Sequence, residues 1–318
     1  MRKVYECDLH GHTNRSDGND TPREYIDHAA SRGLKVVAIT DHDVIPPDKV
    51  ETEMGCEDIL KYARRKNIHL MKGIEISTET KIDDVHLVCF GCDWSLDYFK
   101  ELDEFTIQSK KGSYKKLVLA LQELGMAVSW DEVLDNNANP VPEDKVQKKM
   151  IFELMARKGY VESWKDAKLF VKNSPKLHIK REKPKAVEVI GQIHKMGGIV
   201  ILAHPYLIKE SVEYGGNVIS REEFIEVLIE HGLDGIEASY SYDKTSYDGK
   251  MTPEEIEQEV LKKYEGRDLI MSGGSDYHGD KKKGIKNPRD IGERGISYAQ
   301  FCSYDKLKVL IDIYTFVI

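Results

Sequence analysis

Short apolar runs separated by longer polar segments are the main pattern of this chain. Most of the runs are rich in β-branched residues, and histidine, aspartate or glutamate follows them at once. An apolar run of about four to eight residues is typical of a strand that is buried on both faces, as in a parallel sheet. The pattern predicts strands at residues 4–10, 36–39, 69–77, 87–90, 199–203 and 269–271.

Helix start signals lie between the predicted strands. Thr21, Ser220 and Thr252 each begin an S/T-x-x-E sequence, in which the hydroxyl and the glutamate satisfy free backbone donors at a helix N-terminus. Gly33 and Gly232 lie where a glycine would end two of these helices. Because strands and helices alternate, we expect an α/β fold with a parallel sheet that closes into a barrel.

Residues 95–185 interrupt this alternation. Helices are predicted at 95–123, 145–157 and 163–171, with a loop at 136–142 and no convincing strand. We interpret residues 95–185 as a helical insertion, carried by a barrel domain that comprises residues 1–94 and 186–318. Loops at one end of a barrel carry its function, so the insertion is expected to act as a lid or a substrate-binding cap.

Candidate metal ligands lie at the ends of the predicted strands. His10 and His12 are two residues apart, so their side chains would point to one side, with His12 exposed beyond the strand. Imidazole is the commonest protein ligand for a transition metal. An isolated H-x-H motif is a weak signal, but similar residues recur downstream. They are Asp17, His42, Glu75, His204, Asp276 and His278, together with His86, which precedes its strand.

These nine candidates exceed the roughly four ligands of a single zinc ion. They fit two or three divalent ions that share bridging carboxylates. Imidazole and carboxylate suit Mn²⁺, Zn²⁺ and Fe²⁺ alike, so the metal is left open. Asp41 and Asp43 flank His42, and we expect them to orient an imidazole ring.

Length, composition and charge limit the domain organisation, the partners and the location that we expect for this protein. A chain of 318 residues with 40% apolar residues allows one large domain, or a domain with an insertion. No apolar run approaches the roughly 18 residues that would span a bilayer, and we expect neither a signal peptide nor a membrane partner. A net charge of −8 argues against binding long nucleic acid. Five cysteines without framework spacing suggest the cytoplasm.

Taken in order, the motifs resemble those of the PHP family, which is named for polymerase and histidinol phosphatase. The matching segments run from one end of the chain to the other: Asp-Leu-His-Gly-His-Thr at 8–13, Ser-Asp-Gly at 16–18, Ile-Thr-Asp-His-Asp at 39–43, Gly-Ile-Glu at 73–75, His-Leu at 86–87, Ala-His-Pro at 203–205 and Gly-Gly-Ser-Asp-Tyr-His at 273–278. The resemblance implies a distorted seven-stranded (β/α) TIM-like barrel with a trinuclear metal centre.

The resemblance also implies how the ligands are divided among three ions. His10, His12, Glu75 and Asp276 would hold the first ion. Glu75 would bridge to a second ion, which His86 and His204 would also hold. Asp17, His42 and His278 would hold the third, and family members carry either histidine or aspartate at the Asp17 position.

The insertion departs from the family pattern. Relatives that act on nucleotide-like substrates carry an Arg-Pro-His-Ile-Ala stretch before Gly-Tyr-Val; here Gly-Tyr-Val is present at 159–161, but Lys148 replaces the arginine and Met150 the histidine. Arginine grips phosphate with two hydrogen bonds, whereas lysine is a point charge. Lys148 and Arg15 are the cations expected to contact substrate. The segment Gly-Ile-Glu-Ala-Ser-Tyr at 235–240 also lacks the Tyr/His-Pro pattern that relatives often carry after the corresponding strand.

The leading hypothesis is a metal-dependent phosphoesterase, in which a metal-bridging hydroxide attacks the phosphorus of a small, nucleotide-like ester such as a nucleotide bisphosphate or AMP. An alternative is a phosphatase of histidinol phosphate or of another small molecule. A less favoured alternative is a metal-stabilised module without activity, because such domains lose ligands and all nine positions are intact here. The sequence gives no oligomeric state.

Overall fold

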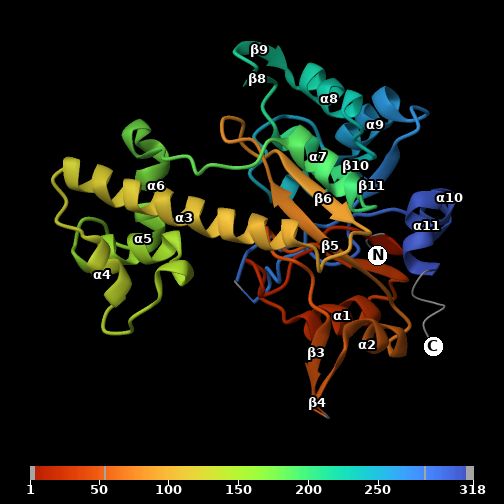
Figure 1. Cartoon of the computed structure of the whole chain (residues 1–318), viewed down its shortest axis with the longest axis horizontal. Coiled ribbons are helices and arrows are strands. Elements are labelled where there is room, and N and C mark those ends of the chain that lie inside the picture. Colours follow the sequence, from red (N-terminus) through yellow and green to blue (C-terminus); the bar gives the residue numbers. More distant parts are fainter. Residues whose placement is uncertain (1–3, 54, 283, 313–318) are drawn as a thin grey trace. The chain divides into compact units, whose positions relative to one another are not determined.

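The computed structural model describes residues 4–53, 55–282 and 284–312. Contacts divide the chain into two compact units, Met1–Phe99 with Pro184–Ile318 and Lys100–Lys183, and the boundary between them falls within helix α3 (Figure 1). The first unit carries every strand of the described residues. None of the described helices is long and apolar enough to cross a membrane.

The strands of the described residues are β1 Cys7–Asp8, β2 Val36–Ile39, β3 Lys49–Thr52, β4 Gly55–Asp58, β5 His69–Ser77, β6 His86–Phe90, β7 Ile199–Leu202, β8 Ser211–Tyr214, β9 Asn217–Ser220, β10 Gly235–Ser239 and β11 Ile270–Gly273. The α-helices are α1 Pro22–Ser31, α2 Ile59–Arg65, α3 Asp97–Glu123, α4 Trp130–Asp135, α5 Lys148–Arg157, α6 Trp164–Asn173, α7 Ala186–Lys195, α8 Arg221–Glu230, α9 Pro253–Tyr264, α10 Tyr298–Ser303 and α11 Asp305–Asp312.

The main sheet has seven strands in the order β1-β2-β5-β6-β7-β10-β11. Backbone bonds also join its two edge strands: the Leu9 amide donates to the Gly273 carbonyl at 3.1 Å, and the Asp276 amide donates to the His10 carbonyl at 3.0 Å. The sheet is therefore a nearly closed barrel, and the predicted distorted seven-stranded α/β barrel is confirmed. Strand β1 is shorter than the predicted 4–10: it ends at Asp8, and the backbone of Leu9 and His10 then bonds to Gly273 at the end of β11 and to Asp276 beyond it.

One strand runs against the others. Strand β6 pairs antiparallel with both β5 and β7, so the prediction of a wholly parallel sheet was wrong at this position. A parallel crossover needs about a dozen residues or more, and only residues 78–85 separate β5 from β6. The reversal places the first residue of β6 opposite the last residue of β5, with His86 paired to Ser77.

Alternation along the strands fills both faces of the barrel with apolar side chains. One set packs in the interior, where Val36, Met71 and Ile201 belong to a cluster that Phe301 and Leu307 of α10 and α11 also join. The other set, which includes Val37 and Leu70, packs with side chains from α1 and α2. Burial on both faces explains why the sequence shows continuous apolar runs, as predicted.

The predicted helix ends are also confirmed. Thr21, Ser220 and Thr252 form complete capping boxes, and Gly33 and Gly232 have positive φ angles of 77° and 98° just after their helices. Two antiparallel hairpins, β3–β4 and β8–β9, and the short helix α4 were not predicted.

The second unit has an apolar core of its own. Side chains from α3 to α6 form it, among them Leu121, Val133, Ile151 and Ala167, all nearly inaccessible to solvent. Met150, which stands where the family pattern has histidine, is partly buried against this core. The predicted helices of this region are confirmed to within a few residues. Its role as a lid stays a prediction.

Gly274 should be essential to the barrel closure. A Cβ atom at this position would lie 2.3 Å from the His10 Cβ and 2.6 Å from its backbone nitrogen, so neither atom could move without shifting β1. We expect Gly274→Ala to lower the free energy of unfolding by about 1–3 kcal/mol, as overpacking does. Urea denaturation followed by circular dichroism measures this change.

Gly191→Ala is the matched control, because Gly191 lies in α7 and a Cβ atom there would meet nothing within 4 Å. Alanine should stabilise this helix by up to about 1 kcal/mol. Equal stabilities of the two variants would contradict the packing described at Gly274.

Candidate metal centre

The polar ends of the strands meet at one edge of the barrel. His10 and His12 follow β1, His42 follows β2, Glu75 lies near the end of β5, and His204 follows β7. Asp276 and His278 follow β11, and His86 reaches the same edge because β6 is reversed. His86 was the exception to the sequence pattern, and the antiparallel strand explains it.

Glu75 is the central group of this cluster, and solvent does not reach it. Its Oε2 atom lies 3.1 Å from His10 Nε2, 3.2 Å from His12 Nε2 and 3.0 Å from His42 Nδ1. Its Oε1 atom lies 3.0 Å from His86 Nδ1 and 3.1 Å from His204 Nε2. The two carboxylate oxygens therefore face two different sets of imidazoles, which is the arrangement that a bridging ligand requires.

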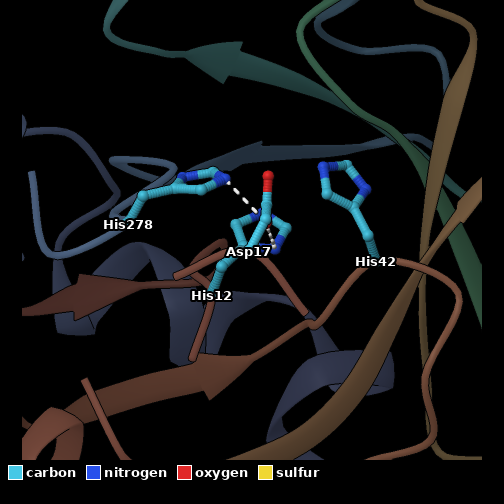
Figure 2. Close-up of side chains that lie close together, drawn as sticks. All are labelled: His12, Asp17, His42 and His278. Atoms are coloured by element: carbon cyan, nitrogen blue, oxygen red, sulfur yellow. Dashed lines mark ion pairs between the residues drawn. The ribbon is translucent and has the colours of Figure 1, made fainter. Parts of the chain in front are cut away.

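A second set of residues adjoins this group. Asp276 Oδ1 lies 3.0 Å from His12 Nε2 and 3.4 Å from His278 Nδ1. Asp17 Oδ1 lies 3.1 Å from His278 Nε2 and 3.9 Å from His12 Nδ1, and Figure 2 shows the Asp17 side chain among the three imidazoles. His12 was expected to be exposed, but it is fully buried because the 13–18 loop and the loop after β11 cover it. Asp17 remains 57% exposed.

Burial and charge oppose each other in the cluster. Burial raises the pKa of Glu75, but the imidazoles of His42, His10 and His86 outweigh it and hold that pKa well below its usual range. Burial lowers the pKa of His12, but Asp276 and Glu75 outweigh it and raise the pKa to about 10. Burial prevails at His42, where the pKa falls to about 3. The carboxylates of Glu75 and Asp276 thus stay ionised, and their charge attracts cations to the cluster.

The donor atoms fit divalent metal ions. Six buried atoms of the cluster form no hydrogen bond of suitable geometry among the described residues, although several of them lie close to one another. They are His10 Nε2, both ring nitrogens of His12, His42 Nδ1, His204 Nδ1 and Glu75 Oε2. Buried polar atoms are normally paired, so this concentration of unpaired nitrogen and oxygen calls for a bound cation.

Three groups of these atoms are close enough to share an ion in the described part of the chain. They are His10, His12 and Asp276; His42, Glu75 and His86; and His12, Asp17, His42 and His278. His204 contacts the second group through Glu75. The structure brings all nine predicted residues together, with His12 and His42 each between two groups. Their roles as ligands stay predictions.

Strained backbone accompanies two of the candidate ligands. His204 and Asp276 have positive φ angles of 29° and 52°, a conformation that residues with a side chain rarely adopt. Such strain costs on the order of 1–3 kcal/mol and concentrates at functional sites. Both strained residues reach the cluster, with His204 Nε2 3.1 Å from Glu75 Oε1 and Asp276 Oδ1 3.0 Å from His12 Nε2.

Glu237 is a candidate functional residue that the sequence pattern did not single out. It lies in β10, is 2% exposed, and its carboxylate lies 3.1 Å from His10 Nδ1 and accepts a bond of 2.8 Å from the His204 amide. It therefore fixes His10 with Nε2 directed at Glu75 and Asp276. A glutamate within the short segment Gly-Ile-Glu-Ala-Ser, at 235–239, was the available signal.

Asp41 and Asp43 were expected to orient an imidazole, and that role stays a prediction. Asp41 accepts hydrogen bonds from the Thr13 amide and hydroxyl, at 2.8 and 2.7 Å, and from the Ser16 hydroxyl at 2.6 Å. Asp43 accepts from the Ser77 amide at 2.9 Å. Asp41 thus fixes the loop between His12 and Asp17, and Asp43 fixes the end of β5.

The two predicted substrate-binding cations lie in different units. Arg15 is exposed, and its guanidinium donates to the Ile45 carbonyl at 3.3 Å. Lys148 is half-buried at the start of α5, where burial and the neighbouring Lys168 lower its pKa. Contact of either residue with substrate stays a prediction.

The sequence matches the model of one protein family and several curated relatives. The family model of the PHP domain matches residues 8–302. A 5'-3' exoribonuclease of Haemophilus influenzae is 28% identical over 64% of this chain and 70% of its own length. A 3',5'-nucleoside bisphosphate phosphatase of Chromobacterium violaceum is 23% identical over 90% of both chains. A phosphoribosyl 1,2-cyclic phosphate 1,2-diphosphodiesterase of Eggerthella lenta is 24% identical over 86% of this chain and 94% of its own length.

A solved structure is similar over nearly its whole length. A protein from Bifidobacterium adolescentis, assigned as a metal-dependent phosphoesterase, superposes with a TM-score of 0.65 at 26% identity, covering 94% of this chain and 95% of its own. The predicted class of enzyme, a metal-dependent phosphoric ester hydrolase, is confirmed by these relatives together with the cluster. From the match across residues 8–302, and from the family motifs that meet at one edge of the barrel, it follows that this chain belongs to the PHP domain family.

Proposed function

We propose that this protein hydrolyses a small, nucleotide-like phosphate ester with two or three divalent ions bound at the Glu75 cluster. One observation carries the proposal: the two oxygens of a fully buried glutamate face two separate sets of imidazoles. Divalent ions bound close together supply Lewis acidity and make hydroxide available at neutral pH. Mn²⁺, Zn²⁺ and Fe²⁺ all suit the donor set.

The chain's own residues would hold this chemistry in place. Glu75 would bridge two ions, and the other eight candidate ligands would complete their coordination. Glu237 would keep His10 in one orientation through its bond to Nδ1, leaving Nε2 to bind metal. Burial of Glu75, His10, His12 and His204 would lower the local dielectric constant, which strengthens electrostatic contacts made at this side of the cluster.

A small nucleotide-like substrate is favoured by two observations. The relative from Chromobacterium violaceum, named for 3',5'-nucleoside bisphosphates, matches over 90% of both chains, including the insertion region. The net charge of −8 disfavours long nucleic acid. Arg15, which lies in the same unit as the cluster, would supply a further phosphate contact. We also propose a cytoplasmic location for the enzyme.

Action on the 5' end of RNA is a second candidate, and a specific observation supports it. The exoribonuclease of Haemophilus influenzae has the highest identity among these relatives, 28% over 212 residues. Both candidates require hydrolysis at phosphorus. They differ in the leaving group, which is a small nucleoside compound in the first candidate and the rest of an RNA chain in the second.

Glu75→Gln should abolish most of the activity, because the amide keeps the shape but cannot bridge two cations. Metal ions contribute several kcal/mol to stabilising a phosphoryl transition state, so we expect kcat/KM to fall by about a thousandfold. Steady-state assays with Mn²⁺ and metal analysis of the purified variant measure both effects. Glu226→Gln is the control, since Glu226 is exposed and pairs with Arg267 on the surface. Unchanged activity and metal content in Glu75→Gln would contradict the proposal.

Metal binding should release protons at pH 7. His12 has a pKa of about 10 without metal, so its ring is protonated at neutral pH, yet it must be neutral to bind a cation. We expect release of about one or more protons per chain, and an affinity that rises with pH until His12 loses its proton. Calorimetric titration with Mn²⁺ in HEPES and in Tris measures the number of protons released, because the two buffers differ in ionisation enthalpy. The same enthalpy in both buffers would exclude this linkage.

A substrate panel should separate the candidate functions. We expect the highest kcat/KM with a nucleoside 3',5'-bisphosphate or AMP, measured with Mn²⁺ present by chromatographic separation of all products, because hydrolysis of a phosphodiester releases no inorganic phosphate. The other members are a 5'-phosphorylated RNA oligonucleotide, a ribose 1,2-cyclic phosphate and histidinol phosphate. Preference for the oligonucleotide would favour the second candidate. Preference for histidinol phosphate would show that the predicted nucleotide-like specificity is wrong.

A further inference from the structure

The two carboxylate oxygens of Asp276 have different surroundings. Oδ1 faces the cluster, 3.0 Å from His12 Nε2, 3.4 Å from His278 Nδ1 and 3.7 Å from His10 Nε2. Oδ2 faces away from these rings and accepts two hydrogen bonds of 2.6 Å, from the Tyr240 hydroxyl and from Arg289 Nη1. Only Oδ1 is thus open to the imidazoles.

Arg289 is itself held by a second carboxylate. Its Nε donates to Asp280 Oδ2 at 2.9 Å, its Nη2 lies 3.4 Å from Asp280 Oδ1, and its backbone amide donates to Oδ2 at 3.2 Å. Asp280 is 2% exposed, and the Arg289 side chain is 14% exposed. The guanidinium therefore has a fixed orientation between two buried carboxylates.

Tyr240 is fixed as firmly. The residue is 1% exposed, and its ring packs against Tyr242 and close to His10 and His204. Its position one residue after β10 places the hydroxyl beside the loop that follows β11. Neither this tyrosine nor Arg289 was identified from the sequence.

We propose that Arg289 and Tyr240 form a clamp on Asp276 that presents Oδ1 alone to a metal ion and keeps Oδ2 out of its coordination. The inference rests on the proposed metal-dependent function and adds positioning residues to it. Charge-assisted bonds from arginine to carboxylate are among the strongest hydrogen bonds in proteins, so Oδ2 stays with Arg289 while Oδ1 binds.

Arg289 acts here through Asp276 and not on substrate. Its Nη1 and Nε donate to buried carboxylates and its side chain is only 14% exposed, so its charge-assisted bonds hold Asp276 and Asp280. Arg289 also offsets the negative charge that Asp276 and Asp280 bring into a buried region. The role predicts an effect on metal affinity and kcat, with little effect on KM.

The test compares Arg289→Ala and Arg289→Lys with the wild type. Competition with a chelator gives the affinity for Mn²⁺, and the visible spectrum of the Co²⁺-loaded protein reports coordination number. We expect Arg289→Ala to bind Mn²⁺ about 10–100-fold more weakly, the range seen when partners of a metal ligand are removed. The Co²⁺ bands should weaken as Oδ2 joins the coordination. kcat should fall to a similar extent, with KM nearly constant, and Arg289→Lys should restore part of each loss.

Arg294→Ala is the matched control, since Arg294 is in the same loop but pairs with Glu254. Its metal affinity and Co²⁺ spectrum should equal those of the wild type. If Arg289→Ala fails to fold, Tyr240→Phe removes the other bond to Oδ2 and should weaken Mn²⁺ binding in the same direction, by a smaller factor.

Three outcomes would overturn the clamp. The first is wild-type Mn²⁺ affinity and Co²⁺ spectrum in folded Arg289→Ala, and the second is wild-type Mn²⁺ affinity in Tyr240→Phe where that variant replaces it. The third is a rise in KM with kcat unchanged in Arg289→Ala, which would make Arg289 a substrate contact. The affinity and spectrum need no substrate. If the wild type cleaves no phosphate ester while Arg289→Ala loses metal, the clamp stands and the proposed function fails.

Discussion

The ionised carboxylate of Glu75, buried among five imidazoles, is the constraint on which the rest of the site depends. A buried charge is costly unless it is compensated, and here the compensation comes from five rings that four separate segments of the barrel supply. Each of those parts must end at the same level for the rings to reach one carboxylate. The barrel edge meets this requirement, because its strands end together around one axis.

The reversed strand β6 follows from the same requirement. In a wholly parallel barrel the residue before a strand lies at the opposite end from the residues that follow its neighbours. Because β6 runs antiparallel, its first residue, His86, reaches the Glu75 Oε1 atom that β5 presents. The short connection at 78–85 enforces the reversal, so a local feature of the chain completes the site.

Much of this arrangement could be predicted from the sequence, since apolar runs ending in His, Asp or Glu report both the strands and their common edge. The helix caps at Thr21, Ser220 and Thr252 could also be predicted from the S/T-x-x-E pattern. Other features depend on contacts between distant segments, which no local pattern encodes. Only closure of the barrel brings together the segments that bury His12. The same is true of the contact between His10 Nδ1 and the Glu237 carboxylate and of the ion pair between Arg289 and Asp276. The direction of β6 could have been inferred from the length of 78–85 alone.

The most direct test of a Glu75-bridged centre is a crystal structure of the metal-loaded protein with anomalous scattering recorded at the Mn, Fe and Zn edges. The account predicts at least two anomalous peaks, with a different Glu75 oxygen about 2.0–2.2 Å from each, the usual distance for a carboxylate ligand. A single peak that contacts one oxygen of Glu75, or peaks that leave Glu75 uncoordinated, would contradict it.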